Sequence, residues 1–232
     1  MRKKKFLVAV VFSVFAATLT VFFIWSNPGA DPDPERYAYQ ISEFGHQDEL
    51  VPPKPGSIVF VGSSSIRGWE LVERFPDFPA VNRGFGGSEI SDVNYYIEDL
   101  VLKYDPSVVV LYAGENDISG RKTANQLLED YRRFVERVTE HNSETDIIYI
   151  SIKPSPKRMK IWAEIGAANE KIRKFSACNR DYHFVDITRS MLNSDAEPKS
   201  FLYKEDGIHM TAAGYDIWTA ALKPLLLMIN ES

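Results

Sequence analysis

The chain has 232 residues, of which 44% are hydrophobic and 25% charged, and its formal net charge is −5. This composition is typical of a globular protein with one sizeable core and one domain. The single cysteine, Cys178, excludes an internal disulfide framework and a cysteine-rich metal site. Because Cys178 ends an apolar-periodic stretch, 172–178, we expect it to be a buried small hydrophobe.

Residues 1–26 are predicted to form a membrane anchor or signal outside the folded domain. Four basic residues, 2–5, precede an uncharged apolar run from Phe6 to Trp25. A helical run of this length, at about 1.5 Å per residue, spans roughly the 30 Å of a bilayer core. Residues 26–30 make a poor cleavage site, so an uncleaved anchor is preferred to a cleaved signal that would release a secreted protein. The basic cluster should stay cytoplasmic, which predicts an extracytoplasmic domain.

The charge of the remaining chain limits its partners. The first 26 residues hold four of the 27 basic residues and none of the 32 acidic ones, which leaves 23 basic against 32 acidic residues, a net charge of −9. This charge disfavours nucleic acid and anionic membrane surfaces as partners. Residues 27–56 are rich in proline and acidic residues and are predicted to be a linker, with a short helix near 37–44. The domain is predicted to cover 57–232.

The domain alternates short apolar runs with amphipathic ones. Runs rich in Val, Ile and Tyr predict buried strands at 57–61, 80–82, 107–112, 146–152 and 182–187. Apolar residues at helical spacing predict helices over 90–101, 127–138, 161–175 and 215–226. This alternation predicts a parallel sheet of about five strands with helices on both faces, and functional sites gather at the carboxyl ends of such strands.

The loops after the first two strands carry serines and glycines. After the first strand comes Gly62-Ser63-Ser64-Ser65, in which a serine at a helix start can present its hydroxyl to a substrate. A simple helix cap is the competing interpretation, and local physics does not select one of the three serines. After the second strand comes Gly84-Phe85-Gly86-Gly87, which predicts backbone in close approach to a ligand or with positive φ. The spacing of nucleotide-binding glycine motifs is absent.

Two further blocks complete the set. Asn116, in Gly114-Glu115-Asn116-Asp117, can donate its side-chain amide to an oxyanion, although an Asx turn would use the same residues. Asp206 precedes His209 by three residues, just before the last predicted helix. A carboxylate at this spacing can orient an imidazole that acts as a general base.

Together, these four blocks resemble those of the SGNH (GDSL-type) hydrolase family, which includes esterases similar to platelet-activating-factor acetylhydrolase. The resemblance covers about 57–228 and implies a three-layer α/β/α sandwich of flavodoxin-like type. It implies Ser64 as nucleophile, Asp206 and His209 as its acid and base partners, and an oxyanion hole formed by Ser64, Gly87 and Asn116. Ser63 and Ser88 stand where the family often has aspartate, which leaves the subfamily and the substrate open.

The resulting hypothesis is a serine esterase that hydrolyses a short-chain acyl or O-acetyl ester of a small molecule or glycan, with no metal or cofactor. The alternatives are an O-acyltransferase acting on a cell-envelope polysaccharide and a non-catalytic binding module. The basic segment 153–158 could form a rim that contacts an anionic or sugar-bearing substrate, or be a solvated loop. Trp162 and Phe201 could line a substrate pocket, although core packing is the default expectation for both.

Overall fold

The computed structural model describes residues 33–231, and the fold is carried by the compact unit that begins at Tyr37. The segment predicted as an anchor, 1–26, lies outside the described residues. Between residues 33 and 231 no helix combines the length and the apolar character that a bilayer crossing requires.

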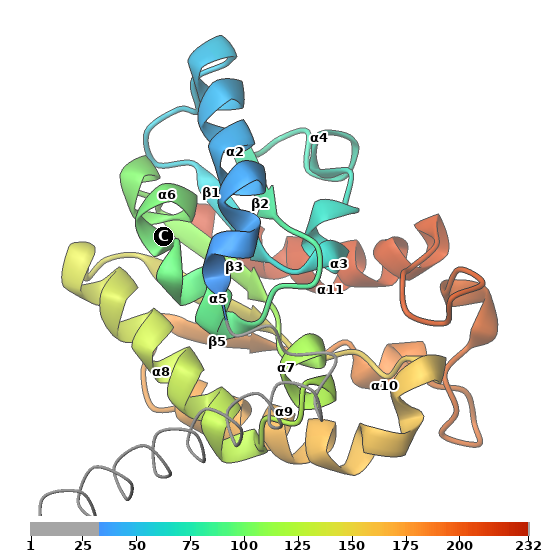
Figure 1. The fold of residues 1–232 in the computed structure, drawn as a ribbon. Coiled ribbons are helices and arrows are strands. Elements are labelled where there is room, and N and C mark those ends of the chain that lie inside the picture. The colour runs from blue at the N-terminus through green and yellow to red at the C-terminus, as the bar shows by residue number, and fades with distance from the viewer. Residues whose placement is uncertain (1–32, 232) are drawn as a thin grey trace, which may run out of the picture. The chain divides into compact units, whose positions relative to one another are not determined.

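Five parallel strands form the central sheet, in the order β2-β1-β3-β4-β5 (Figure 1). The strands are β1 (Ile58–Gly62), β2 (Ala80–Gly84), β3 (Val108–Tyr112), β4 (Asp146–Ile150) and β5 (Tyr182–Val185). Every residue of β1 and β3 is buried, because helices cover both faces of the sheet. The prediction of a parallel sheet of about five strands in a three-layer sandwich is confirmed.

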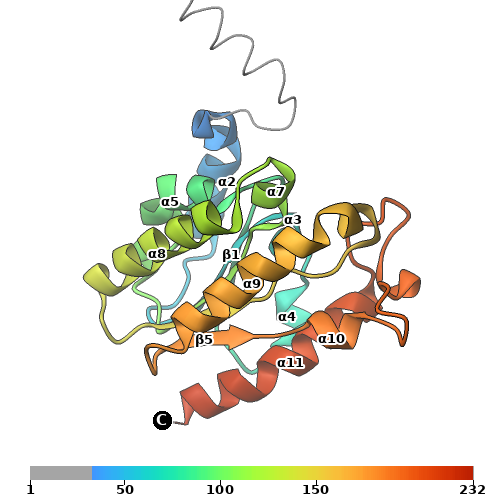
Figure 2. The same ribbon diagram turned by 90° about the horizontal axis from the view of Figure 1, so that it is seen from below.

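The longer helices pack on opposite faces of the sheet (Figure 2). One face carries α2 (Ala38–Leu50), α5 (Ile90–Tyr95), α6 (Ile97–Leu100), α8 (Ala124–His141) and α9 (Trp162–Ser176). The other face carries α3 (Ser64–Arg67), α4 (Leu71–Arg74), α10 (Thr188–Met191) and α11 (Ala212–Asn230). Short turns complete the chain: η1 (Pro34–Tyr37), α7 (Glu115–Ser119), and the 3₁₀ segments Leu102–Tyr104, Pro156–Ile161 and Ser200–Leu202.

Local sequence explains where these elements begin and end. Helix α8 starts at a capping box in which the Thr123 hydroxyl accepts from the Gln126 N–H and the Gln126 side chain accepts from the Thr123 N–H. The predicted helix over 90–101 is two helices, because the backbone of Tyr96 leaves the helical region between α5 and α6. Cys178 is exposed, so the prediction of a buried cysteine is wrong. It lies beyond the end of α9, among residues 177–180, which are all exposed.

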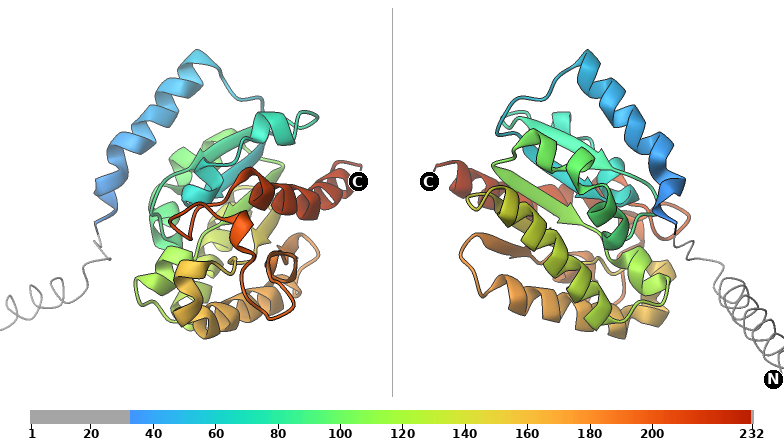
Figure 3. Two further views of the ribbon diagram at one scale, coloured as in Figure 1. Left: turned by 90° about the vertical axis from the view of Figure 1, so that its right-hand side faces the viewer. Right: turned by 60° about the vertical axis from the view of Figure 1, so that its left-hand side comes forward.

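Helix α2 packs on the domain although it comes from the proline-rich segment (Figure 3). Tyr37 and Ile41 are buried in the core, and the Tyr37 ring meets the Phe85 ring edge-on at 4.9 Å between centroids. Asp48 near its end forms an ion pair with Arg83 of β2. The compact unit therefore includes the last part of the segment predicted as a linker.

The strand register places the candidate site. Gly62 of β1 aligns with Gly84 of β2 and with Tyr112 of β3, so the three loops that follow leave the sheet at one level. The strand order reverses between β1 and β3, and in sheets of this order ligands bind outside the carboxyl ends of the strands at that reversal.

Candidate active site

The loop after β1 presents Ser64 at the first position of α3. Gly62 has φ of +134°, and a Cβ there would lie 1.9 Å from the Tyr112 carbonyl oxygen, so only glycine allows β1 to end this close to β3. Helix α3 is held from the other side by Tyr215 of α11, whose hydroxyl donates to the Ser65 carbonyl at 2.9 Å. Ser64 is the half-buried serine of the three, whereas Ser63 and Ser65 are buried.

The Asp206–His209 segment is a tight turn closed by its own hydrogen bonds. One carboxylate oxygen of Asp206 accepts from the backbone N–H groups of Ile208 at 2.8 Å and His209 at 2.9 Å. The Lys204 N–H donates to the His209 carbonyl at 2.7 Å, and Gly207 takes φ of +66° at the tip. The turn leaves the second carboxylate oxygen of Asp206 2.6 Å from Nδ1 of His209.

This geometry fixes the histidine tautomer. An ionised carboxylate can only accept, so Nδ1 carries the proton that it donates to Asp206, and Nε2 faces Ser64 as an acceptor. The Ser64 hydroxyl lies 3.0 Å from Nε2 and donates to it. Hydrogen bonds from the His209 ring and from the Ile208 and His209 N–H groups hold the pKa of Asp206 well below its usual range. The carboxylate therefore stays charged under weakly acidic conditions.

The predicted oxyanion donors follow β1, β2 and β3, which end in register. The Asn116 amide donates to the Ser88 carbonyl at 3.0 Å, which orients the amide toward the glycine loop and leaves its second N–H. Gly87 has φ of +82°. Among the hydrogen bonds of residues 33–231, none is donated by the backbone N–H of Ser64 or Gly87. Donors left unpaired in this way can point at a developing anion.

Sequence reasoning missed one residue beside this loop. The Tyr37 hydroxyl lies 3.2 Å from the position that a Cβ on Gly87 would occupy, so the first residue of the compact unit packs against a predicted oxyanion donor. No local motif signals this contact, because Tyr37 lies in the segment predicted as a linker and the packing partner is fifty residues along the chain.

Only part of the predicted basic rim, 153–158, lies at the surface. Lys153 is fully buried and forms an ion pair with Glu115, so it contacts no solvent and its place in the rim is a wrong prediction. Lys157 is exposed. Its backbone N–H donates to the Gly207 carbonyl at 3.1 Å, which places Lys157 beside the turn that carries His209. Trp162 packs against the core. Phe201 is 65% exposed, so the default expectation of core packing is wrong for it.

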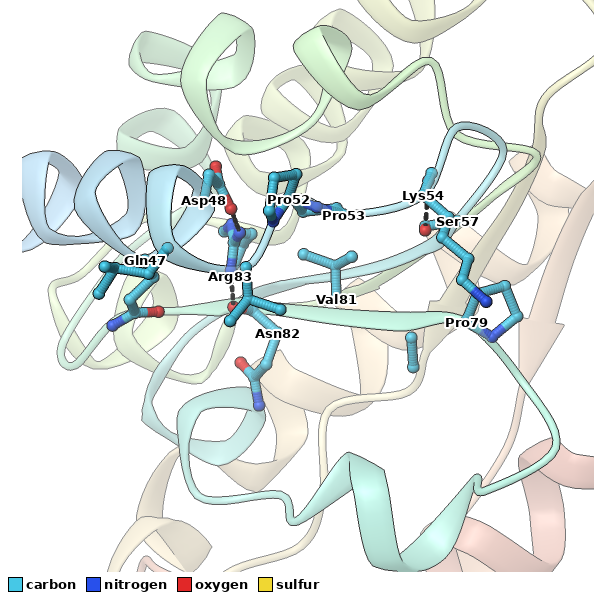
Figure 4. Close-up of a pocket in the computed structure, with 13 residues that line it drawn as sticks. Gln47, Asp48, Pro52, Pro53, Lys54, Ser57, Pro79, Val81, Asn82 and Arg83 are labelled. Carbon is cyan, nitrogen blue, oxygen red and sulfur yellow. Dashed lines mark hydrogen bonds and ion pairs between the residues drawn. The ribbon is translucent and has the colours of Figure 1, made fainter.

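A hollow of about 530 Å³ lies elsewhere, between the end of α2 and the edge strand β2 (Figure 4). Pro52, Pro53, Val81 and Arg83 are among its lining residues, and none of the five predicted site residues lines it. The side chains of His209 and Asp206 are instead 40% and 45% exposed. The candidate site is thus open at the protein surface. Within residues 33–231, no group of three or more His, Cys, Asp or Glu side chains is arranged to hold a metal ion.

A serine, a histidine and an aspartate in contact at the strand-order reversal of such a sheet place the chain among the hydrolases of the three-layer α/β/α class. The sequence profile of the GDSL-like lipase/acylhydrolase family matches residues 56–217, and the chain belongs to this family. The resemblance to SGNH hydrolases is confirmed, and the protein is a carboxylic ester hydrolase.

Solved structures share the fold. A protein from Streptococcus pneumonia provisionally named as a platelet activating factor is 20% identical with a TM-score of 0.74, and the match covers 92% of this chain and 99% of that one. A GDSL-like lipase from Bacteroides thetaiotaomicron is 21% identical with a TM-score of 0.70, covering 82% and 97%. A carbohydrate esterase of family 3 from Talaromyces cellulolyticus is 17% identical with a TM-score of 0.63, covering 75% and 98%. No curated protein matches the sequence.

Proposed function

We propose that the protein hydrolyses a carboxylic ester by a two-step acyl transfer through Ser64. His209 takes the Ser64 proton as the hydroxyl oxygen attacks the ester carbonyl, and Asp206 stabilises the imidazolium that forms. His209 then returns the proton to the leaving alcohol, and water releases the acyl group by the reverse sequence. The observation that carries this proposal is the unbroken contact from Asp206 through His209 to the Ser64 hydroxyl.

The oxyanion hole in this proposal consists of the N–H groups of Ser64 and Gly87 and the Asn116 amide. The free backbone donors and the orientation of the amide by the Ser88 carbonyl support it. Each such donor is typically worth about 10²–10³ in turnover, because it is already in place when negative charge develops.

We infer that the substrate is a short acyl ester, and an O-acetyl group on a glycan is the preferred candidate. The open position of His209 and Asp206 supports this choice, because a surface site admits a polymer. The fold shared with a carbohydrate esterase adds to it. Screening the protein against acetylated polysaccharides and against short- and long-chain p-nitrophenyl esters tests the choice. Faster turnover of long-chain esters would contradict it.

The decisive variant for the mechanism is Ser64→Ala. We expect it to lower the turnover of p-nitrophenyl acetate by at least about 10³-fold while the melting temperature stays unchanged. A fluorophosphonate should label the wild-type protein at Ser64. Ser63→Ala is the matched control, because His209 forms its side-chain hydrogen bonds with Asp206 and Ser64 and not with this neighbouring serine, and the variant should keep most of the activity. A fully active Ser64→Ala variant would exclude the mechanism.

We further propose that residues 6–25 anchor the protein in a membrane with the domain on the extracytoplasmic side. The uncharged apolar run behind a basic cluster supports this proposal. The full-length protein should stay in the membrane fraction after washing with concentrated salt. Recovery of the intact chain in the soluble fraction would contradict an anchor, and recovery of a shortened chain would indicate a cleaved signal.

A further inference from the structure

A buried ion pair lies directly behind the candidate site. Lys153 follows β4 and its side chain is 0% exposed, and Glu115 begins α7 with a side chain that is 6% exposed. Their ammonium and carboxylate groups are in contact. The proposed acyl transfer uses neither group, so both need another explanation.

Every donor of the Lys153 ammonium group has an acceptor. Besides Glu115, Nζ donates to the Ser65 hydroxyl at 3.3 Å and to the Tyr112 hydroxyl at 3.2 Å. An ammonium group has three N–H donors, so this one is fully paired. Glu115 in turn accepts from the Ser155 hydroxyl at 2.6 Å and from the Tyr112 hydroxyl at 3.3 Å.

These partners come from the loops that carry Ser64 and Asn116 and from the segment that contacts the His209 turn. Ser65 follows the proposed nucleophile, and Glu115 precedes the proposed oxyanion donor Asn116. Ser155 begins the turn that leads to Lys157, whose N–H binds the Gly207 carbonyl in the His209 turn. A single buried charge pair thus connects the loops of Ser64, Asn116 and His209.

Stability alone is a poor reason for this arrangement. Burying two charges is costly, and well-packed apolar residues of similar volume often replace a buried pair with no loss of stability. A fully satisfied polar network does something that apolar packing does not, because its directional bonds fix one geometry. A misplacement of about 1 Å at a catalytic group can cost about 10²-fold in rate.

We propose that the Lys153–Glu115 pair is a positioning device that holds Ser64 and Asn116 in register for the esterase reaction. Lys153 acts on the nucleophile side through the Ser65 hydroxyl, and Glu115 acts on the oxyanion side through the chain to Asn116. Neither residue touches substrate. This inference rests on the proposed function of Ser64 and Asn116.

The test separates positioning from stability by comparing single and double variants. Lys153→Met and Glu115→Leu each leave one charge buried alone, and each should lower the melting temperature by roughly 10 °C. The double variant removes both charges and should melt close to the wild type. Its kcat for p-nitrophenyl acetate should nevertheless stay about 10²-fold below that of the wild type, with KM changed by less than about 3-fold. A double variant that recovers both stability and kcat would overturn the proposal.

Two smaller variants keep the test valid if the double variant does not fold. Ser65→Ala and Ser155→Ala each remove one hydrogen bond to the pair and strand no charge. Each should lower kcat by about 3- to 10-fold at an unchanged melting temperature. Unchanged kcat in both would also overturn the proposal.

Leu226→Ala is the control for stability. Leu226 is buried in α11 near Met228 and Ile229, which line a hollow together with Asp146 at the amino end of β4, whereas the candidate site lies at the carboxyl ends of the strands. This variant should lower the melting temperature like the single charge variants while the folded protein keeps its kcat.

A wild-type protein that hydrolyses no ester and is not labelled at Ser64 would refute the proposed function, and the positioning role with it. An active wild type with an equally active double variant would refute the positioning role alone.

Discussion

Asn116 lies between two buried carboxylates that meet their lysines in different surroundings. On one side, Glu115 pairs with Lys153, whose side chain is 0% exposed. On the other side, Asp117 is also 0% exposed, but its partner Lys122 is 21% exposed. Lys122 also binds Glu89 at 3.0 Å and Asp130 at 2.7 Å. The first pair is buried from solvent and contains one charge of each sign. In the second, one partly exposed lysine is shared among three carboxylates.

The difference shows what each pair can contribute to the proposed site. Lys153 hydrogen-bonds to Ser65 beside Ser64 and to Glu115 beside Asn116. A change in this buried pair therefore shifts the loops that carry the proposed reacting groups. Asp117 instead accepts from the Ile90 N–H at 3.1 Å, at the start of α5. This carboxylate ties the Asn116 loop to the helix that follows the glycine loop. Water can replace part of the interactions of the partly exposed Lys122, but it cannot reach the fully buried Lys153.

The largest expected effect comes from Asn116, which lies between the carboxylates of the two pairs in the chain. Asn116→Ala should lower kcat for p-nitrophenyl acetate by about 10²–10³-fold, because the proposed oxyanion loses its side-chain donor. The free energy of unfolding, measured in urea, should change little, since Asn116 is only half-buried. Asn94→Ala is a matched control, because Asn94 is another half-buried asparagine whose amide donates to one carbonyl, that of Asp130. Equal activity of the two variants would argue against Asn116 as an oxyanion donor.

The next effect sharpens the contrast between the lysines. Lys122→Met should lower the free energy of unfolding by about 1–3 kcal/mol, because solvent can partly replace the lost ammonium. Lys153→Met should cost about 3–5 kcal/mol, because the Glu115 charge is left buried without its cation. Urea unfolding of the two variants measures this difference directly. Equal losses, or a larger loss for Lys122→Met, would show that exposure does not distinguish the pairs.

The sequence predicts the sheet well, for a physical reason. Buried parallel strands require continuous apolar runs, so β1 and β3 are visible as such in the sequence. The carboxyl ends of parallel strands share one edge, so side chains after two strands can be placed together without coordinates. Ser64 follows β1 and fits this expectation, whereas Asp206 and His209 lie in the loop before α11 and are assigned to the site by the family resemblance; His209 contacts both Asp206 and Ser64.

The supporting network could not be predicted in the same way. A lysine after a strand is normally solvated, and only its partner 38 residues away explains why Lys153 is buried. The packing of α2 depends on Tyr37 meeting Phe85, which no local pattern indicates. Exposed Phe201 and Cys178 show the same limit from the other direction, because apolar character alone does not determine whether a residue in a short turn or beyond a helix end is covered.

The comparison also predicts a pH dependence of stability in the cluster around Lys122. Burial raises the pKa of Asp117 from 3.8 to about 7, although Lys122 opposes the shift. Between these two values the folded protein keeps a proton that the unfolded chain has released, so the contribution of Asp117 to the free energy of unfolding falls as pH rises through this window. Lys122 is charged in both states over the same range and adds no slope there. The Asp117→Asn variant has no titrating proton at this position. Its free energy of unfolding relative to the wild type should therefore rise from pH about 4 to about 7 and level off above that. Urea unfolding at intervals across this range measures the change, and wild-type and variant curves that stay parallel would show that Asp117 is already ionised throughout.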